Sequence, residues 1–383
     1  MTAEQLLNTI ICVSFFLFAF IAIVNPNKVN IMANRWLGIF FLNVGLKIAA
    51  AVVDGDHAAH QFDWLLRFVD LSHCATPALF YLSVVQFATP GKFNRKYYLS
   101  FVPGAIVFLL ILPFNLLPAF KGYPFPKLVL NTIIYTIFLT SNLQMWVLWA
   151  LAWYKLYKHQ KNIQLVASNT TPVDLRWLNY LLYIIGIMML IFVANNLLMI
   201  HSQSLYRQII YLFCSLVICY YLIAQKEIFP YQPAAIAEVS QVIEEFQHQP
   251  KQIKPRMDDK LSHRLKLRLE HLMVHDKLYL DSELNLPQLA QSMEVSVHDL
   301  SYLLNDSVGM NFFQFINAYR VKEAKLLMLS DQHKHLNILG IAYSAGFSSK
   351  TTFNTAFKKQ TGLSPSQFMK QGEIAANVSY QAW

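Results

Sequence analysis

Seven stretches of this chain are long and apolar enough to cross a membrane as helices. A helix in a bilayer must satisfy its own backbone hydrogen bonds, and about 17 to 25 residues are needed to cross the hydrocarbon. The stretches cover residues 6–24, 37–53, 64–88, 99–117, 128–153, 177–200 and 209–224. The first of them has no basic segment before it and no small-residue cleavage site after it, so it is interpreted as a retained anchor and not as a signal peptide.

Composition separates this apolar part from a second, polar part. Of the 383 residues only 14% are charged, whereas an average soluble protein has about 25%. Residues 1–225 contain 6 acids and 14 Lys or Arg, and the remaining 158 residues contain 16 acids and 17 Lys or Arg. We therefore expect a seven-helix transmembrane sensor domain at 1–225, a juxtamembrane linker at 226–260, a soluble domain at 261–372 and a tail at 373–383.

The distribution of cations around the seven stretches predicts their orientation. Cytoplasmic flanks carry an excess of Lys and Arg. One set of flanks contains ten cations and the other contains four, Arg67, Lys121, Lys127 and Arg207. The set of ten is Lys28, Arg35, Lys92, Arg95, Lys96, Lys155, Lys158, Lys161, Arg176 and Lys226. This bias predicts an N-terminus outside the membrane and a polar C-terminal part in the cytoplasm.

The linker has two features whose role stays open. Ile236, Val239, Ile243 and Phe246 recur at the spacing of a coiled-coil seam, over barely one and a half heptads. They indicate either a short amphipathic helix that rests on its own protein or on the bilayer, or a seam that forms a homodimer. Residues 251–268 contain seven cations, which suit anionic membrane lipid and DNA phosphate equally.

Helix-capping residues divide the soluble part into short helices. After an amphipathic helix at 261–274, the punctuating residues are Pro287, Ser296 with Asp299, Asn311 with Gln314, Asn337, Gly346, Ser348, Gly362, and Ser364 with Pro365. They delimit two pairs of helices, each with a short turn, joined by one long helix that begins after Asn311. Two helix-turn-helix units of this kind predict a bihelical DNA-binding domain.

The second helix pair carries a specific pattern. The sequence A-x3-GF begins at Ala342, and F-x3-FKK-x-x-G-x-SP begins at Phe353. Together with NFFQFINAYRVKEAKLLM upstream, this pattern closely resembles the DNA-binding domain of the AraC/XylS family of bacterial transcription regulators, over residues 261–370. The resemblance implies an all-α fold, sequence-specific binding of promoter DNA with both recognition helices in successive major grooves, and RNA polymerase as a partner. Many relatives carry a soluble sugar-binding or dimerisation domain where this chain has its apolar stretches.

The resemblance also assigns residues that face DNA. By position, the base-contacting places fall on His298, Ser301 and Tyr302 in the first recognition helix, and on Lys350, Thr351 and Thr355 in the second. Phe353 and Phe357 are four residues apart and face the core, so Asn354 and Lys358 lie beside Lys350 on the outer face. Arg320, Lys358 and Lys359 are expected to contact phosphate or to pack.

The two halves of the DNA-binding domain differ in charge. Residues 270–312 contain one Lys and seven acids, whereas residues 313–370 contain eight cations and two acids. Because counterion release requires cations near phosphate, we predict that the second helix-turn-helix supplies most of the affinity.

Ionisable residues within the apolar part are candidates for sensing a signal, because burying them in a membrane is costly. Arg67, Asp70 and His73 follow one another every three residues, and Lys47 could join them. They form either a structural ion pair with a packed histidine or a responsive site. His57 and His60 lie in an acidic loop that is either simply hydrated or a site that senses a metal such as Zn²⁺ or pH, and no cofactor is expected.

The sequence therefore predicts an all-α protein, a seven-transmembrane helix bundle followed by a cytoplasmic bihelical domain. Its expected function is that of a one-component regulator in a bacterial inner membrane, which couples an unknown small signal to promoter binding. The alternatives are a transporter or receptor with a regulatory tail, and an interaction protein whose helix-turn-helix no longer binds DNA. An enzyme is not expected, because the chain has no phosphate-binding Gly-rich loop, HExxH motif or nucleophile elbow.

Overall fold

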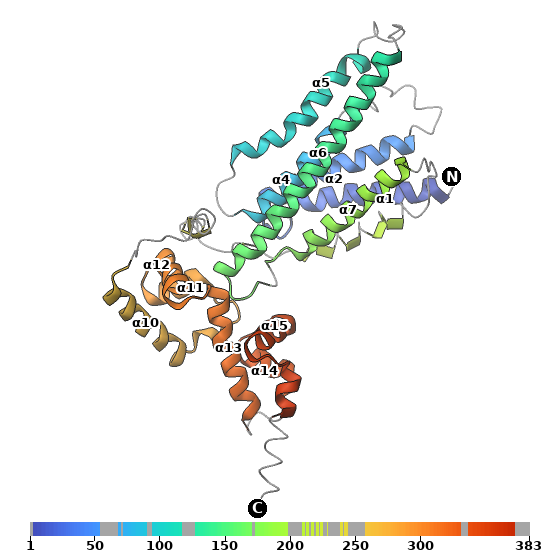
Figure 1. The fold of residues 1–383 in the computed structure, drawn as a ribbon. Coiled ribbons are helices and arrows are strands. Elements are labelled where there is room, and N and C mark those ends of the chain that lie inside the picture. The colour runs from blue at the N-terminus through green and yellow to red at the C-terminus, as the bar shows by residue number, and fades with distance from the viewer. Residues whose placement is uncertain are drawn as a thin grey trace, which may run out of the picture. The chain divides into compact units, whose positions relative to one another are not determined.

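The computed structural model describes residues 3–53, 68–69, 72–89, 94–116, 127–170, 173–197, 257–330 and 336–371, together with separate positions between 209 and 243. These residues are helical apart from turns and one isolated β-bridge, so the all-α prediction is confirmed for them. The chain divides into two compact units (Figure 1). The first contains residues 1–159 and 175–228, and the second contains residues 160–174 and 229–383.

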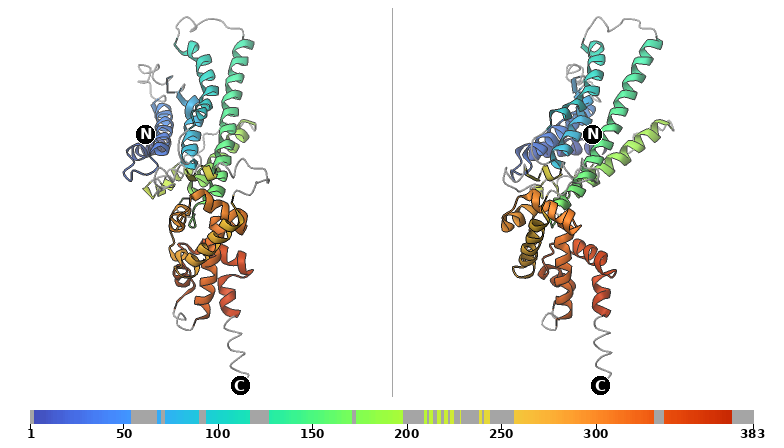
Figure 2. Two further views of the ribbon diagram at one scale, coloured as in Figure 1. Left: turned by 90° about the vertical axis from the view of Figure 1, so that its left-hand side faces the viewer. Right: turned by 60° about the vertical axis from the view of Figure 1, so that its left-hand side comes forward.

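The first unit consists of long apolar helices. They are α1 (Ala3–Val24), α2 (Ile31–Val53), α4 (Thr76–Ala88), α5 (Val102–Leu116), α6 (Lys127–Asn162) and α7 (Arg176–Leu197) (Figures 1 and 2). The 3-10 turns η2 (His73–Ala75) and η3 (Arg95–Phe101) directly precede α4 and α5. Helix α6 ends within the second unit, because that unit begins at Gln160.

Small and polar residues join these helices. A Cβ atom on Gly38 would lie 2.5 Å from Cγ1 of Ile23 and 3.1 Å from the carbonyl oxygen of Ala19, so α1 and α2 approach closely at this glycine. The Thr76 hydroxyl donates to the Asn43 side chain at 2.7 Å, and the Trp149 indole donates to the Leu182 carbonyl at 2.8 Å. Close contact at glycine and hydrogen bonds between helices are typical of packing in membranes.

The structure does not support the prediction of seven spans. Among the described residues, one helix, Gln5–Val24, is long and apolar enough to cross a membrane, while Thr76–Ala88 and Arg176–Ile191 are shorter apolar helices. Helix α4 has 13 residues and α5 has 15, since each begins after a 3-10 turn, and about 17 are needed to span.

The second unit contains the predicted short helices. They are α10 (Asp259–Val274), α11 (Leu286–Met293), α12 (Val297–Tyr302), α13 (Phe312–Leu329), α14 (Ile338–Ser344), α15 (Lys350–Thr361) and a last helix at 365–371. A π-helical turn, η7 (Leu303–Val308), extends α12, and the 3-10 turn η6 (Leu278–Leu280) lies between α10 and α11.

Most of the predicted caps form. Asn311 and Gln314 make a reciprocal capping box at the start of α13, and Asn337 accepts the amide of Gly340 at 2.7 Å. Gly362 ends α15 with φ 76°, as expected of a left-handed cap. Two details differ from the sequence prediction. Ser349, not Ser348, caps α15, and α11 begins one residue before Pro287 with Asn285 and Gln288 as its capping box.

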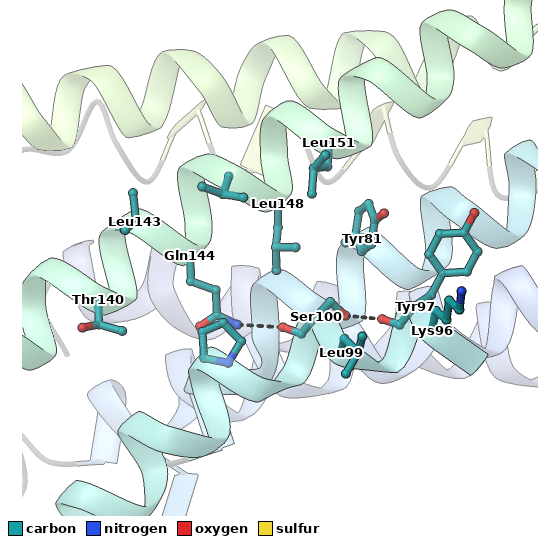
Figure 3. A pocket seen from close by; sticks show the side chains of 12 residues that line it. Tyr81, Lys96, Tyr97, Leu99, Ser100, Thr140, Leu143, Gln144, Leu148 and Leu151 are labelled. Atoms are coloured by element: carbon teal, nitrogen blue, oxygen red, sulfur yellow. Dashed lines mark hydrogen bonds between the residues drawn. The ribbon is translucent and has the colours of Figure 1, made fainter. Parts of the chain in front are cut away.

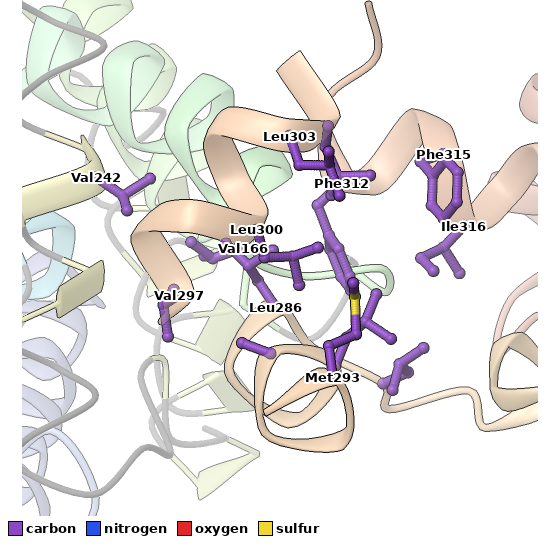
Figure 4. Packing of buried hydrophobic residues seen from close by; sticks show 14 of the residues in the cluster. Val166, Val242, Leu286, Met293, Val297, Leu300, Leu303, Phe312, Phe315 and Ile316 are labelled. Atoms are coloured by element: carbon purple, nitrogen blue, oxygen red, sulfur yellow. The ribbon is translucent and has the colours of Figure 1, made fainter. Parts of the chain in front are cut away.

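Two hydrophobic cores flank α13. One surrounds Phe353, Phe357 and Phe347 between α13, α14 and α15. The other surrounds Leu300 and Phe312, and it recruits distant segments (Figure 4). These contributions are Ile163, Val166 and Ala167 from the chain between α6 and α7, and Val239, Val242 and Ile243 from the linker.

The linker residues therefore pack within their own chain. Val239 and Ile243 are 0% and 5% exposed, which agrees with an amphipathic segment resting on its own protein. In this structure neither residue is available for a dimerisation seam, and Ile236 and Phe246 lie outside the described residues. The second unit thus begins before residue 261, the predicted start of the soluble domain, because residues of the linker belong to its core.

Candidate nucleic-acid interface

Helix α15 presents a polar surface. Phe353 and Phe357 are fully buried, and the helical period places the opposite face of α15 outward. The outward-facing residues are all exposed and are those predicted to contact DNA in this helix, Lys350, Thr351, Asn354, Thr355 and Lys358. The sequence thus places two cations and three hydrogen-bonding side chains on one face of a helix that is held by its opposite face.

The first recognition helix, α12, offers less. His298 and Tyr302 are half-buried, so part of each side chain reaches the surface. Ser301 is 3% exposed, and the amide of Asn305 donates to its carbonyl at 2.8 Å. The assignment of Ser301 to base contact is therefore corrected to packing. It lies one position after the buried Leu300, and Asn305, which bonds to it, belongs to the π-helical turn that follows.

Acidic groups gather at the beginning of α12. The backbone N–H of Val297 donates to a carboxylate oxygen of Glu238 at 3.1 Å, and the Ser296 hydroxyl donates to Asp299 at 2.7 Å. Arg268 forms an ion pair with Glu294 at 2.7 Å. Because carboxylates repel phosphate, this local charge agrees with the prediction that the second helix-turn-helix contributes more affinity.

Arg320 occupies the centre of the second unit and is 1% exposed. Its guanidinium donates to the carbonyl oxygens of Tyr279 and Asp281, both at 2.7 Å, and to the carbonyl and hydroxyl oxygens of Ser168 at 3.3 and 2.9 Å. It also lies 5.9 Å from the ring centre of Phe347. Of its two expected roles, phosphate contact or packing, the structure shows packing.

Burial lowers the pKa of the Arg320 guanidinium to about 10, and the nearby carboxylates of Asp281 and Glu283 oppose part of that effect. The side chain therefore remains charged at neutral pH. A buried charge is stable only where hydrogen bonds replace its hydration, and here four acceptors do so.

The chain between α6 and α7 reaches this arginine. We call Ile163–Thr170 the arm. The arm pairs with the segment before α11 through an antiparallel bridge between Ala167 and Asn285. The Leu286 amide donates to the Val166 carbonyl at 2.9 Å, and the Ser168 amide donates to the Leu284 carbonyl at 3.3 Å. Asn169 donates to Glu283 at 3.0 Å. The arm is thus part of the second unit although the sequence places it between two apolar helices.

Gly346 brings the two helix-turn-helix units together. Its φ is 88°, and a Cβ atom there would lie 2.5 Å from the carbonyl oxygen of Tyr279 and 2.8 Å from Cα of Leu280. The same carbonyl of Tyr279 accepts from Arg320. The turn between α14 and α15 therefore packs against backbone to which Arg320 is hydrogen-bonded. The arm, Arg320 and this turn are thus linked by direct contacts.

A second polar cluster surrounds Tyr279. Its hydroxyl donates to Glu323 at 2.8 Å, and Lys277 pairs with the same carboxylate at 2.9 Å. Burial and then this hydrogen bond raise the pKa of Tyr279 above its usual range. Burial alone would raise the pKa of Glu323, but the hydrogen bonds from Lys277 and Tyr279 outweigh it and hold that pKa below 4.5.

Two contributors were missed from the sequence. Ser168 lies in a segment assigned to a loop between spans, and Glu238 lies in the linker. No local pattern distinguishes either residue. A clue was the apolar run Ile163, Leu165 and Val166, which is unusual for a hydrated loop.

The predicted sensing residues are only partly described. Arg67, Asp70, His57 and His60 lie outside the described residues, and so does the side chain of His73. Lys47 is half-buried on α2. Among the described residues no group of three or more His, Cys, Asp or Glu is arranged to hold a metal ion. The sensing assignment stays a prediction.

Comparison with known proteins finds relatives of the helix-turn-helix region in the second unit. Residues 289–371 match the model of a helix-turn-helix domain family. The chain is 33% identical over 107 residues to the HTH-type transcriptional regulator MtrA of Neisseria gonorrhoeae, covering 27% of this chain and 34% of that protein. It is 27% identical over 130 residues to the arabinose operon regulatory protein of Escherichia coli, covering 33% of this chain and 41% of that protein.

This chain thus spans between a third and about two fifths of the length of these relatives. No solved structure matches. The matched region contains α12, α13, α14 and α15, and its relatives are regulators of transcription and not enzymes, as the sequence predicted. The C-terminal part of this chain is therefore a helix-turn-helix DNA-binding domain of the AraC/XylS type.

Proposed function

We propose that this protein is a transcription regulator tethered to a bacterial inner membrane, with its N-terminus outside and its DNA-binding domain in the cytoplasm. The observation that carries the proposal is the exposed polar face of α15, on a domain that matches known helix-turn-helix regulators. Lys350 suits the O6 and N7 acceptors of guanine, and Thr351 suits a base edge or a thymine methyl group. Lys358 suits phosphate, and promoter-bound RNA polymerase is the partner through which binding would act.

The tether is supported by an apolar surface on α1. Leu6, Ile10, Val13, Leu17 and Phe20 follow a three-four spacing, and their exposed fractions lie between 43% and 64%. A continuous apolar stripe of this kind is unusual on the surface of a soluble monomer. Lipid would cover it.

The arm supports coupling between the two parts. It continues directly from α6 and precedes α7, while its own contacts lie inside the DNA-binding unit. A signal that changes the position or tension of either helix would reach the arm along the chain. The coupling requires that the signal favours one state of the arm over another.

Footprinting of the intact protein on DNA recovered by chromatin immunoprecipitation tests the proposal. Lys350→Ala should weaken operator binding, whereas Arg35→Ala removes an exposed cation from α2, outside the DNA-binding domain, and should not. Fractionation of cells should place the protein in the inner membrane. Equal footprints for wild type and Lys350→Ala would refute the assignment of α15, and solute uptake by vesicles without any footprint would instead favour a transporter with a regulatory tail.

A further inference from the structure

An open cavity of about 410 Å³ lies in the first unit, between α4, η3, the start of α5 and α6. Its lining residues Leu99 and Leu143 are 65% and 60% exposed, so one side of the cavity is open. Its walls are mainly aliphatic, from Leu99, Pro103, Leu143, Val147 and Leu151. Figure 3 shows Lys96 and Tyr97 at one end and Thr140 and Leu143 at the other. The cavity therefore has mainly apolar walls and a cationic group at one end.

The polar groups along the middle of the cavity bond to neighbouring backbone. The Gln144 amide donates to the Ser100 carbonyl at 3.2 Å, and the Ser100 hydroxyl donates to the Tyr97 carbonyl at 2.8 Å. Because these polar groups already have hydrogen-bond partners, they do not require a polar ligand group beside them. The middle of the cavity therefore suits a hydrocarbon chain.

At the cationic end Lys96 and Tyr97 line the cavity, and Lys155 lies behind the Tyr97 phenol without lining the cavity itself. Lys155 donates to the Tyr97 hydroxyl at 2.7 Å and lies 4.8 Å from the centre of its ring, and Lys96 is exposed at the mouth. Both lysines belong to the flanks that the cation count assigns to the cytoplasmic surface. A charged headgroup at this level would remain hydrated while its chain entered the apolar part.

We propose that this cavity binds a single-chain amphiphile with an anionic headgroup, of the fatty-acid class. The anion would face Lys96 and the Tyr97 hydroxyl, to which Lys155 donates, and the chain would lie along Leu143, Val147 and Leu151. The volume of about 410 Å³ is large enough to hold one hydrocarbon chain of about a dozen carbons. The proposal deepens the proposed function, because the amphiphile would be the signal. It rests on that function for the coupling to DNA, since α6, which lines the cavity, continues into the arm.

Binding is tested on the full-length protein in discs of phosphatidylcholine, with dodecanoate as the probe. Val147→Phe should fill the cavity and weaken saturable binding by about tenfold or more. Leu139→Phe is the matched control, since Leu139 is an exposed leucine of the same helix that does not line the cavity, and it should bind as wild type does. Equal binding by Val147→Phe and wild type would overturn the site and indicate partition into the bilayer.

The headgroup is tested by changing its charge. Dodecanol and dodecyltrimethylammonium should bind about tenfold more weakly than dodecanoate, and Lys96→Gln with Lys155→Gln should remove that preference. Dodecyl phosphate distinguishes a phosphate source from a carboxylate source, and tighter binding of the phosphate would overturn the fatty-acid class. Co-purification of a two-chain lipid in the cavity, identified by mass spectrometry and lost in Val147→Phe, would overturn the single-chain proposal.

Footprinting with and without dodecanoate separates this proposal from the proposed function. A footprint that dodecanoate changes in wild type but not in Val147→Phe supports both the site and its coupling to DNA. Saturable binding with an unchanged footprint retains the site and refutes the coupling through α6. Absence of any footprint, with binding intact, refutes the proposed function alone.

Discussion

Ser168→Ala tests whether the arm is part of the DNA-binding unit. The Ser168 hydroxyl accepts from the buried guanidinium of Arg320 at 2.9 Å and donates to the Leu284 carbonyl. A hydrogen bond to a charged group contributes about 1.5 to 3 kcal/mol, and Arg320 is too deeply buried for water to replace this acceptor. The arm should therefore open about 10 to 100 times more often in the variant.

Native-state hydrogen exchange of the full-length protein measures this opening. The amides of Ser168 and Leu286 make the backbone bonds between the arm and the segment before α11, so their exchange should accelerate by that factor. Ser292→Ala is a suitable control, because its hydroxyl makes only an exposed bond to the Gln288 carbonyl in its own helix. Unchanged exchange at Leu286 in Ser168→Ala would refute the reasoning. Equal acceleration at Phe357, in the other core, would mean that the whole unit and not the arm is destabilised.

Three further predictions concern the DNA-binding domain. Lys350→Ala should weaken operator binding by about 1 to 3 kcal/mol and relax preference at one base pair, as competition footprinting would show; equal affinity for all variant operators would contradict it. Gly346→Ala should cost more stability than Gly309→Ala, measured by chemical unfolding, because both have positive φ but only Gly346 lies against backbone; about 1 to 2 kcal/mol is expected from φ alone, and equal losses would contradict the close approach. Glu323 has a folded-state pKa below its ordinary value of 4.5, so its ion pair stabilises the fold above that pH, and this stability is lost as pH falls through the folded-state pKa. In Glu323→Gln the free energy of unfolding should therefore depend less on pH in this acid range, and an unchanged dependence would count against the ion pair.

The sequence predicted the elements that are encoded locally. The side chains of Asn311 and Gln314 predict the start of a helix, and the backbone freedom of Gly362 predicts the end of another. The structure contains both caps. The outward face of α15 followed from the spacing of Phe353 and Phe357. Such features depend on residues three or four positions apart, which a single sequence displays directly.

Features that depend on distant pairing were not predictable in this way. Arg320 and Ser168 are 152 positions apart, and an arginine in a DNA-binding helix suggests phosphate until its acceptors are known. Ser301 was misassigned because position alone does not show that α12 continues into a π-helical turn. The membrane spans rest on length and hydropathy, and the 3-10 turns that shorten α4 and α5 leave no clear sign in either measure.

If the proposed function is correct, the contacts of Arg320 provide a route by which a change at the membrane would alter DNA binding. The two recognition helices read DNA together only if their separation matches successive major grooves. We expect that separation to depend on the contact of Gly346 with Tyr279, whose carbonyl accepts from the same Arg320 guanidinium that binds Ser168. Losing the Ser168 bonds would leave a buried charge short of acceptors, which favours a rearranged state by about 1.5 to 3 kcal/mol. A signal that binds the two states with that difference in affinity would shift their ratio by about 10 to 100 times, which is sufficient for regulation.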